Sequence, residues 1–541
     1  MEKYTYIFDG VATSYTEPSD TAVEAVRGKM RRAGINAGAY KLRIYKKSVD
    51  ARRRDDVKLV YSVCAESDAD RSCDRAKFER LGARCVRVEA LDIKFGNEPM
   101  RERPLVVGMG PAGMFCALIL AENGYRPIII DRGDSINDRV AAVQRFYTTH
   151  ILDTESNIQF GAGGAGTFSD GKLLTRINDP KCSYVLETFR RFGAPEEVTV
   201  KAKPHIGTDV LRGVVDSILG HIESLGGEVI YRCKLTDVCQ MQEGLIKAIT
   251  TKGEFVCSSV VLALGHSARD TYGMLLERGF DIIPKPISVG VRIEHKRADI
   301  ERALYGELAG HEALGAAEYA LSDTKGERGV YTFCMCPGGE VVAAASEQGG
   351  VVVNGMSHYA RNGENSNSAV AVSIRVEDYE SVNGSLALGA IEFQRKIERA
   401  AFAAGGGGYA VPVQTVGDFL SGKQGTEPSY VMPTYMDAGN YKVASMDDVL
   451  PPYVTKSLRY GISSFDKKLS GFSDERAILL GAETRTSAPL RIKRQDDMTA
   501  IGRSGIYPCG EGAGYAGGIT SAAVDGVKVA LAIMEKYSPA K

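Results

Sequence analysis

The chain has 541 residues, too many for a single hydrophobic core, so we expect three or four domains, or two large ones and a small one. With 44% hydrophobic residues, 25% charged residues and a formal net charge of −1, the composition is that of a globular protein. This balance does not favour nucleic acid or an anionic membrane surface as a partner, and no run of about 18 apolar residues predicts a membrane span. The first residues, MEKYTYIFDG, do not resemble a secretory signal. We therefore expect a cytoplasmic protein whose eleven cysteines are reduced.

Residues 1–97 are predicted to form a small α+β domain. Apolar residues at helical spacing indicate a helix over 21–34, and strands are expected at 41–45 and 57–63. Between these strands lies KKSVDARRRDD (46–56), which we interpret as a solvated connection. The alternative is a basic patch for an anionic ligand or partner. FGNEPM (95–100) is expected to link this domain to the next.

A βαβ unit follows at residues 105–131. Leu105–Val107 is the expected first strand, residues 112–123 the helix, and RPIIID (126–131) the second strand. The turn between strand and helix carries the G-x-G-x-x-G pattern of dinucleotide-binding folds. Strand, glycine turn, helix, strand and acid occur in the required order, so this pattern predicts a dinucleotide site.

Each residue of this pattern has a physical role. Gly108 allows the tight turn, Gly110 lets the backbone approach a diphosphate, and Gly113 lets the helix pack close to the strand. The helix N-terminus offers free N–H groups to the diphosphate. Asp131 lies 18 residues after Gly113, the position of a carboxylate that accepts from a ribose hydroxyl. A carboxylate there would repel a 2′-phosphate, which argues against NADP in this pocket.

The C-terminal region distinguishes FAD from NAD. GIYPCGEGAGYAGGITSAAVDGVKVA (505–530) has a short strand, an acid at Glu511, a glycine-rich turn and a helix from about Ile519. Such a helix N-terminus can face the flavin edge where reduction places negative charge. VVLALGHSA (260–268) is similar to the middle motif of the same class of flavoproteins. Three elements in this order predict FAD.

The sequence resembles a bacterial family of FAD-dependent dehydrogenases whose substrate is largely unassigned. The family lies within the glutathione-reductase-like flavoprotein superfamily, on the side nearer fumarate reductases and aromatic hydroxylases. The matching stretches extend from the N-terminal domain to the C-terminus: KKSVDARRRDD, VVGMGPAGMFCALILAENGYRPIIIDRG, FGAGGAGTFSDGKLLTR, HIGTDVLRGVV, VLALGHSARDT, TFCMCPGG, ETRTSAPLRI and YPCGEGAGYAGGI. Asp131 and Glu511 stand where relatives often carry Glu and Asp, and both changes keep the carboxylate.

The resemblance and the motifs together imply an α/β fold with a discontinuous, Rossmann-like FAD-binding domain. We expect the small α+β domain at 1–97, the FAD-binding domain at 98–284 and 476–541, and an inserted α+β substrate or cap domain at 285–475. The expected FAD-binding residues are Gly108, Gly110, Pro111, Ala112, Gly113, Asp131, Arg132, Gly163, Gly164, Ala165, Gly166, Thr167, Lys172, Ala263, Gly265, Gly510, Glu511, Gly517, Gly518 and Ile519.

GAGGAG (161–166) also satisfies the glycine pattern, but neither a buried strand nor a helix flanks it. We interpret it as a loop lying against FAD, in which Thr167 and Lys172 contact ligand oxygens. The chain is therefore expected to lack a built-in NAD(P) domain. NAD(P)H could still bind transiently in an open active site as the electron donor.

Three residues are candidates for catalysis. Arg485 could neutralise a reduced flavin or a substrate carboxylate, and a salt bridge to Glu483 is the alternative. His266 could transfer a proton, although a hydrogen bond to a loop carbonyl is favoured. Arg292 is a weaker candidate on the strand that opens the insert.

Cys334 and Cys336 form a C-x-C pair. A reduced, packed pair is favoured over a redox-active disulfide, which would need a strained ring at this spacing. No second ligand pair supports zinc, so no metal site is expected.

The predicted function is transfer of a hydride between FAD and an unidentified small organic substrate at the face of the insert. A separate electron-transfer partner is compatible with this prediction. Two alternatives remain open. One is a flavin-dependent RNA-modifying enzyme that uses the basic stretch at 46–56 on phosphates, although nucleic acid is not the favoured partner. The other is a non-catalytic FAD-binding redox sensor or scaffold.

Overall fold

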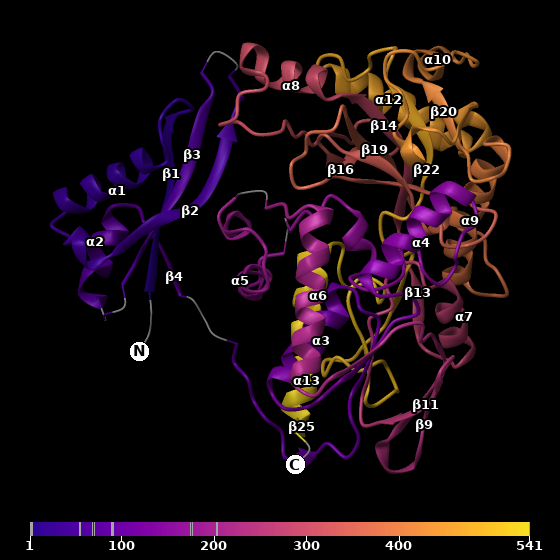
Figure 1. The fold of residues 1–541 in the computed structure, drawn as a ribbon, viewed down its shortest axis with the longest axis horizontal. Helices are drawn as coiled ribbons and strands as arrows, with labels where there is room; N and C mark the ends of the chain where they lie inside the picture. The colour runs from indigo at the N-terminus through magenta and orange to yellow at the C-terminus, as the bar shows by residue number, and fades with distance from the viewer. Residues whose placement is uncertain are drawn as a thin grey trace.

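The computed structural model describes residues 4–53, 56–67, 69, 71–87, 91–173, 175, 177–201 and 204–539. An N-terminal unit in indigo lies to one side of a larger body (Figure 1). In that body, a column of long helices lies below a strand-rich region built from the middle of the chain. No helix among the described residues is long and apolar enough to cross a membrane.

The N-terminal unit is a four-stranded antiparallel sheet with the order β2-β3-β1-β4. Its elements are β1 (Tyr4–Ser14), α1 (Asp20–Arg32), β2 (Lys41–Asp50), β3 (Lys58–Glu66), α2 (Arg75–Arg80) and β4 (Arg84–Arg87). This is the β-α-β-β-α-β order of ferredoxin-like domains. Both helices lie on the same side of the sheet (Figure 1), and Tyr6 stacks on Phe78 of α2 with ring centroids 3.9 Å apart. The unit therefore has an aromatic cluster around Phe78, and its buried apolar residues belong to one cluster with those of the inserted domain.

The basic stretch differs from the sequence expectation. Residues 46–50 continue strand β2 and pair with β3 after a shift of register between Ile44 and Lys46. Arg52 forms an ion pair with Asp50, at 2.6 Å between nitrogen and oxygen. Arg54 and Asp55 lie outside the described residues. The solvated connection is thus shorter than expected, and one of its arginines is already paired.

The second unit contains a five-stranded parallel sheet with the order β24-β12-β6-β7-β8. Four of its strands are short, apolar and fully buried, as expected of strands covered on both faces, whereas the edge strand β8 is partly exposed. The five strands are β6 (Leu105–Val107), β7 (Ile128–Ile130), β8 (Glu228–Ile230), β12 (Val260–Leu262) and β24 (Ile506–Pro508). The expected strands at 105–107, 126–131 and 505–508 are therefore present with small changes in their bounds.

Alternate residues of these strands enter two different cores. Val106, Ile129 and Val261 pack with the helices α3 (Pro111–Glu122), α6 (Thr208–Ser224) and α13 (Ile519–Lys536). Figure 1 shows these three helices side by side. Leu105 and Val107 face the other way, toward the antiparallel sheet β11-β10-β9. Its strands are β9 (Leu235–Gln240), β10 (Ile246–Thr250) and β11 (Gly253–Cys257).

The insert is built on a seven-stranded sheet with the order β15-β16-β19-β14-β22-β20-β21. Its strands are β14 (Ile287–Lys296), β15 (Ser322–Asp323), β16 (Val330–Cys336), β19 (Asn365–Ile374), β20 (Val411–Thr415), β21 (Tyr441–Val443) and β22 (Ile478–Glu483). Its helices are α8 (Arg297–Tyr305), α9 (Leu386–Ala404), α10 (Val416–Ser421), α11 (Tyr435–Ala438) and α12 (Pro452–Asp466). A small hairpin, β17 (Glu340–Ala343) with β18 (Val353–Met356), completes the insert.

Strand β22 bears on the expected domain boundary. It lies between β14 and β20 and pairs with both. A boundary at residue 475 would separate this buried strand from the sheet that it completes. The chain returns to the parallel-sheet unit after β22, where β23 (Leu490–Ile492) pairs with β13 (Ile282–Pro284).

The remaining elements surround the parallel-sheet unit. They are β5 (Glu98–Pro99), which pairs with β25 (Tyr537–Ser538), and the helices α4 (Ile136–Thr149), α5 (Lys181–Arg191) and α7 (Arg269–Glu277). The β5–β25 pair brings the start and the end of this unit together.

Candidate cofactor and substrate cleft

The turn between β6 and α3 leaves no room for side chains at two of its glycines. Gly108 has φ of +108°, and a Cβ there would lie 2.2 Å from the carbonyl oxygen of Ala263. A Cβ on Gly113 would lie 1.9 Å from the carbonyl oxygen of Gly108. Glycine at both positions therefore lets the helix begin directly beside the sheet.

Gly110 differs from these two glycines. Its φ is −73°, and a Cβ there would meet only the Cα of Gly164, at 3.9 Å. The protein itself thus permits a side chain at this position. The first turn of α3 carries no acidic residue and no side-chain cap, so its N–H groups and the positive end of the helix are available to an anion.

Asp131 closes the other side of this turn. Its two carboxylate oxygens accept hydrogen bonds from the backbone N–H groups of Met109 and Gly133, each at 2.9 Å. A carboxylate oxygen has two lone pairs, so each one can still accept a further hydrogen bond. Asp131 also lines the cleft described next, which leaves it able to accept from a sugar hydroxyl there.

A single cleft extends from this turn to the insert. It encloses about 1390 Å³ of empty space, part of it open to solvent. The parallel-sheet unit contributes Gly110, Asp131 and Ile519, while the insert contributes Cys334 and Asn354. The cleft thus joins the glycine turn to the face of the insert.

The far end of the cleft contains the N-terminus of α13. The helix begins at Ile519 with no acidic residue in its first turn, so its positive end is uncompensated. Glu511 also lines the cleft here, and burial raises its pKa to about 7, an effect that Lys285 opposes. Two helix N-termini, a carboxylate at a strand end and a glycine cradle are the parts that an FAD site needs, so the residues present fit this cofactor.

The glycine loop at 161–168 packs against the first turn of α3. A Cβ on Gly164 would approach the Cα of Gly110 to 3.0 Å. The guanidinium of Arg139, which is fully buried, holds the loop by donating to carbonyl oxygens of residues 157, 158, 162 and 164. The sequence analysis missed Arg139, because nothing in its local pattern distinguishes it from a solvated residue of an amphipathic helix.

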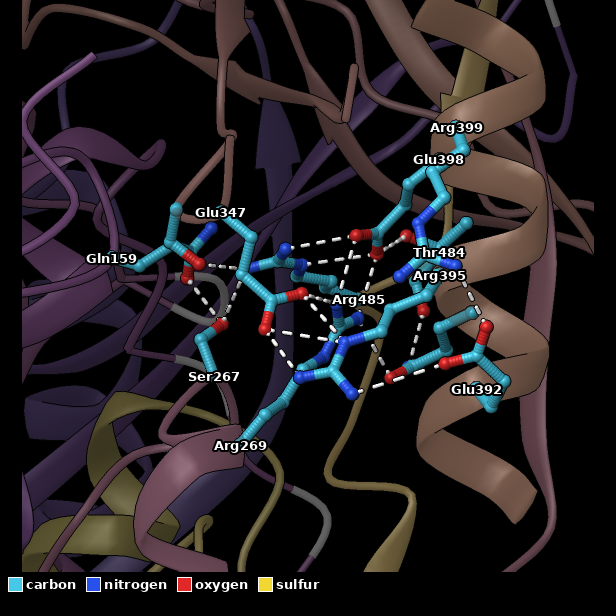
Figure 2. Close-up of polar contacts among 12 residues, drawn as sticks. Gln159, Ser267, Arg269, Glu347, Glu392, Arg395, Glu398, Arg399, Thr484 and Arg485 are labelled. Atoms are coloured by element: carbon cyan, nitrogen blue, oxygen red, sulfur yellow. Dashed lines mark hydrogen bonds and ion pairs between the residues drawn. The ribbon is translucent and has the colours of Figure 1, made fainter. Parts of the chain in front are cut away.

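Arg485 belongs to a buried ion-pair cluster, shown in Figure 2. Its Nη2 lies 3.0 Å from Glu398 of α9, and its Nη1 donates to Ser267 at 3.1 Å and to Ser346. Arg269 donates to the same Glu398 and to Glu347, each at 2.7 Å. Arg485 therefore pairs with Glu398 rather than with Glu483, the partner named as its alternative. It also lines the cleft.

His266 lines the cleft beside this cluster. Burial lowers the pKa of His266 to about 3, and the neighbouring charges of Arg485 and Arg269 act in the same direction. Its Nδ1 lies 2.9 Å from the hydroxyl of Ser267. The ring is therefore neutral near pH 7, and it contacts a side chain rather than the loop carbonyl considered from the sequence.

Arg292, Thr167 and Lys172 do not line the cleft, and their side chains are bound by other groups of the protein. Arg292 is fully buried and pairs with Glu483 at 2.7 Å. Thr167 accepts from Arg139 at 2.6 Å and donates to the carbonyl of Gly164. The structure thus satisfies these groups within the protein. Lys172 donates to the carbonyl oxygen of Met335.

The structure brings most of the other expected residues to the cleft. Those that line it are Gly108, Gly110, Pro111, Ala112, Asp131, Arg132, Gly164, Ala165, Gly166, Ala263, Gly265, His266, Arg485, Glu511, Gly517, Gly518 and Ile519. Gly113, Gly163 and Gly510 lie behind this surface. Among the described residues, no group of three or more His, Cys, Asp or Glu side chains is arranged to hold a metal ion.

Comparison with known proteins identifies the family. The chain is 46% identical over 506 residues to an uncharacterized protein from Clostridium beijerinckii, an alignment that covers 92% of this chain and 93% of that protein. The chain belongs to the same family as this clostridial protein. Residues 286–486 match the family model described as "FAD-dependent protein, C-terminal domain-like". This match includes β22, in agreement with the sheet of the insert. The match to an FAD-dependent domain family agrees with the FAD-dependent family expected from the sequence.

Similar solved structures are more distant. CtdE in complex with FAD is 11% identical, with a TM-score of 0.32, over 80% of this chain and 84% of that chain. Glycine oxidase from Geobacillus kaustophilus is also 11% identical, with a TM-score of 0.31, over 82% of this chain and 97% of that chain. At TM-scores this low, neither similarity bears on the chemistry of the family studied here.

Proposed function

We propose that this protein is an FAD-dependent oxidoreductase that exchanges a hydride with a small organic molecule bound in the cleft. The observation that carries the proposal is the continuity of the cleft. One space joins the glycine cradle of α3, the N-terminus of α13 and the polar side chains of the insert. The family model supports the FAD part of the proposal. The resemblance to the glutathione-reductase-like superfamily, on its fumarate reductase and aromatic hydroxylase side, is compatible with it.

The chain's own residues have distinct tasks in this proposal. The first turn of α3 binds the diphosphate, and Asp131 accepts from a ribose hydroxyl. Bound FAD supplies two-electron chemistry at its flavin ring. The N-terminus of α13 stabilises negative charge at the end of the cleft where Glu511 lies. The insert covers the reacting region and limits the access of water.

Arg485 and His266 are the groups proposed to act on the second molecule. Arg485 is oriented by Glu398 and retains its place in the cleft lining, so it can attract an anionic group of the substrate. His266 is neutral, so its ring nitrogens can form hydrogen bonds with the second molecule without carrying a charge. NAD(P)H as a transient donor, or a separate electron-transfer partner, would supply or remove electrons through the same open cleft.

The test compares two glycines at which the protein itself leaves room for a methyl group. A Cβ on Gly110 meets only one atom, at 3.9 Å, and a Cβ on Gly213 of α6 meets none within 4 Å. Gly110→Ala should lose most of its FAD, because the methyl group occupies the space meant for the diphosphate. Gly213→Ala should keep FAD at the wild-type level. The measurement is the ratio of FAD to protein after purification, with melting curves to show that both variants fold. Equal FAD contents in both variants would contradict the proposal.

A further inference from the structure

The C-x-C pair lies where β16 departs from regular strand geometry. Cys334 has φ of +50°, and the pairing register of β16 with β19 shifts between Phe333 and Cys336. Across this irregularity, the Cys336 thiol donates a hydrogen bond to the backbone carbonyl oxygen of Cys334 at 3.4 Å. The Cys336 side chain is also near enough to that of Cys334 to lower the pKa of Cys334. Residues two apart in a regular strand have a full pleat between them, so the kink is what makes the two thiols neighbours.

The two thiols differ in access. Cys334 is partly exposed and lines the cleft together with Phe333 and Asn354, whereas Cys336 is fully buried behind it. A small molecule in the cleft can therefore reach the sulfur of Cys334 first.

Two cations lie beside the pair. Lys172 donates to the carbonyl oxygen of Met335, the residue between the cysteines. Arg292 donates to the carbonyl of Cys334 at 2.6 Å and to the sulfur of Cys336 at 3.4 Å. From the sequence, Lys172 was expected to bind FAD and Arg292 was a candidate for catalysis, but neither lines the cleft. Each cation is also paired with a carboxylate, Lys172 with Asp170 at 3.7 Å and Arg292 with Glu483 at 2.7 Å. The charge of Lys172 nevertheless favours the thiolate of Cys334, while Asp170 acts against it.

The pKa values of the two thiols move apart. The hydrogen bond from Cys336 and the charge of Lys172 lower the pKa of Cys334 to about 7, against the effect of burial. Burial and the neighbouring Cys334 raise the pKa of Cys336 well above its usual range. Burial also raises the pKa of Cys182, a partly exposed thiol of α5 with no such pair. One thiolate and one thiol in contact is the arrangement that two-step disulfide exchange requires.

We infer that Cys334 and Cys336 form a thiolate–thiol pair that exchanges with a small disulfide entering the cleft. The Cys334 thiolate attacks one sulfur of R–S–S–R, the S–S bond breaks, and RS⁻ leaves. The Cys336 sulfur then attacks Cys334, releasing the second R–S group, and its proton goes to a departing thiolate. The products are two RSH and a Cys334–Cys336 disulfide once solvent has supplied the second proton, so atoms and electrons balance.

This inference rests on the proposed function, because it names small disulfides and their thiols as the substrate class of the same cleft. Regeneration of the dithiol takes two electrons and two protons. Within the proposed function, a reduced flavin is the chemical class of reductant that supplies the electrons.

The experiment follows dithiodipyridine, a small neutral disulfide, with the purified protein at about pH 6.5. Thiopyridone release measures exchange, and mass spectrometry of peptides locates the adduct. A thiolate with a pKa near 7 should react about tenfold faster than an ordinary thiol at this pH, after allowance for its lower nucleophilicity. Cys182 of the same chain is the internal control, because burial raises its pKa even though Lys528 lies nearby.

Two variants separate the attack by Cys334 from the later attack by Cys336. They are Lys172→Met, which affects the first step, and Cys336→Ser, which removes the second. Wild type should release two equivalents rapidly and keep no adduct, whereas Cys336→Ser should release one and keep a stable adduct on Cys334. Lys172→Met should move the midpoint of the rate–pH profile above that of wild type. Because Lys172 is partly buried, melting curves must show that Lys172→Met folds. If it does not fold, the result with Cys336→Ser still tests the inference.

Two results would overturn the inference. One is a Cys334 that reacts no faster than Cys182, and the other is a wild-type adduct as persistent as that of Cys336→Ser. Neither readout requires FAD. Slow thiols in a protein that holds FAD would thus reject this inference alone, and fast thiols in a protein that cannot hold FAD would reject only the proposed function.

Discussion

At the scale of single residues, the cleft depends on charges that the fold has removed from water. Glu398 is 2% exposed and faces two guanidinium groups, those of Arg269 and Arg485 (Figure 2). A buried charge that loses its partner keeps the cost of desolvation without the compensating attraction. The position of Arg485 in the cleft therefore depends on a residue of α9 that is 87 positions away in the sequence.

Glu398→Gln should destabilise the protein by about 3 kcal/mol, because it leaves two buried cations with too little negative charge. Glu347→Gln is the matched control. Glu347 also pairs with Arg269 but is 31% exposed, so its loss should cost no more than about 1 kcal/mol. The midpoints of urea unfolding measure both effects, and equal losses in the two variants would show that the cluster is not a buried ion-pair site.

Glu398 should also make the stability of the protein sensitive to acid. Glu398 has its pKa held well below the usual range by Arg269 and Arg485, against the effect of burial. The charged form thus stabilises the fold above the unfolded pKa of about 4.3, and this contribution is lost as the pH falls below that value. Urea midpoints between about pH 6 and pH 3 should fall more steeply in wild type than in Glu398→Gln. Parallel curves would contradict the assignment.

The contribution of Glu511 to stability depends on pH in the opposite direction. Burial raises its pKa to about 7, so the folded state binds a proton that the unfolded chain has released. Its contribution is present below about pH 4.5 and is lost as the pH rises toward 7. Glu511→Gln should remove that part of the decline, while Glu312→Gln, at an exposed position, should leave it unchanged. Unfolding midpoints at about pH 5 and pH 8 measure the difference, and a decline unaltered in Glu511→Gln would refute it.

At the scale of elements, close backbone contacts fix where the helices begin. The beginning of α3 lies against the β6 turn, because Gly113 lacks a side chain that would meet the Gly108 carbonyl oxygen at 1.9 Å. A similar contact joins α13 to α3, since a Cβ on Gly526 would lie 2.1 Å from the carbonyl oxygen of Ala112. The N-termini of both helices reach the cleft for this reason.

Gly113→Ala should therefore lower stability by about 1–3 kcal/mol, because α3 must move away from the sheet. Gly220→Ala, in α6 with open space around it, should have no such cost and should stabilise the protein by up to about 1 kcal/mol. Chemical denaturation of the two variants checks the difference. A neutral Gly113→Ala would mean that the helix is not packed as closely as described.

The positions of the cofactor motifs were predictable from the sequence, because each motif follows a strand that can itself be recognised. The glycine turn, the acid at Asp131 and the helix at Ile519 each follow a short apolar strand, so chain order alone indicated their positions. The partners of Arg485 were not predictable, because Glu398 lies 87 positions away on α9 and ion pairing leaves no periodic signal. The extension of β2 to Asp50 was missed because β2 has no alternation of buried and exposed residues and its register shifts after Ile44. The place of β22 was missed because pairing with β14 is a long-range contact.

At the scale of the whole molecule, the N-terminal unit contacts the body through few backbone hydrogen bonds, among them that from Lys47 to the carbonyl of residue 200 at 3.0 Å. Its sheet and helices enclose their own aromatic cluster around Phe78. A protein lacking residues 1–87 should therefore fold and bind FAD at the wild-type ratio. Purification and FAD quantification test this expectation, and an aggregated or FAD-free product would show that the unit is needed by the body.

The central claim is that the cleft holds FAD and exchanges electrons there. The most direct measurement is the visible spectrum of the purified protein, recorded without added flavin, before and after anaerobic NADPH, NADH and a small thiol. The account predicts bands near about 370 and 450 nm that bleach with at least one of these donors. A protein that shows no flavin bands and takes up no FAD on reconstitution would contradict the claim.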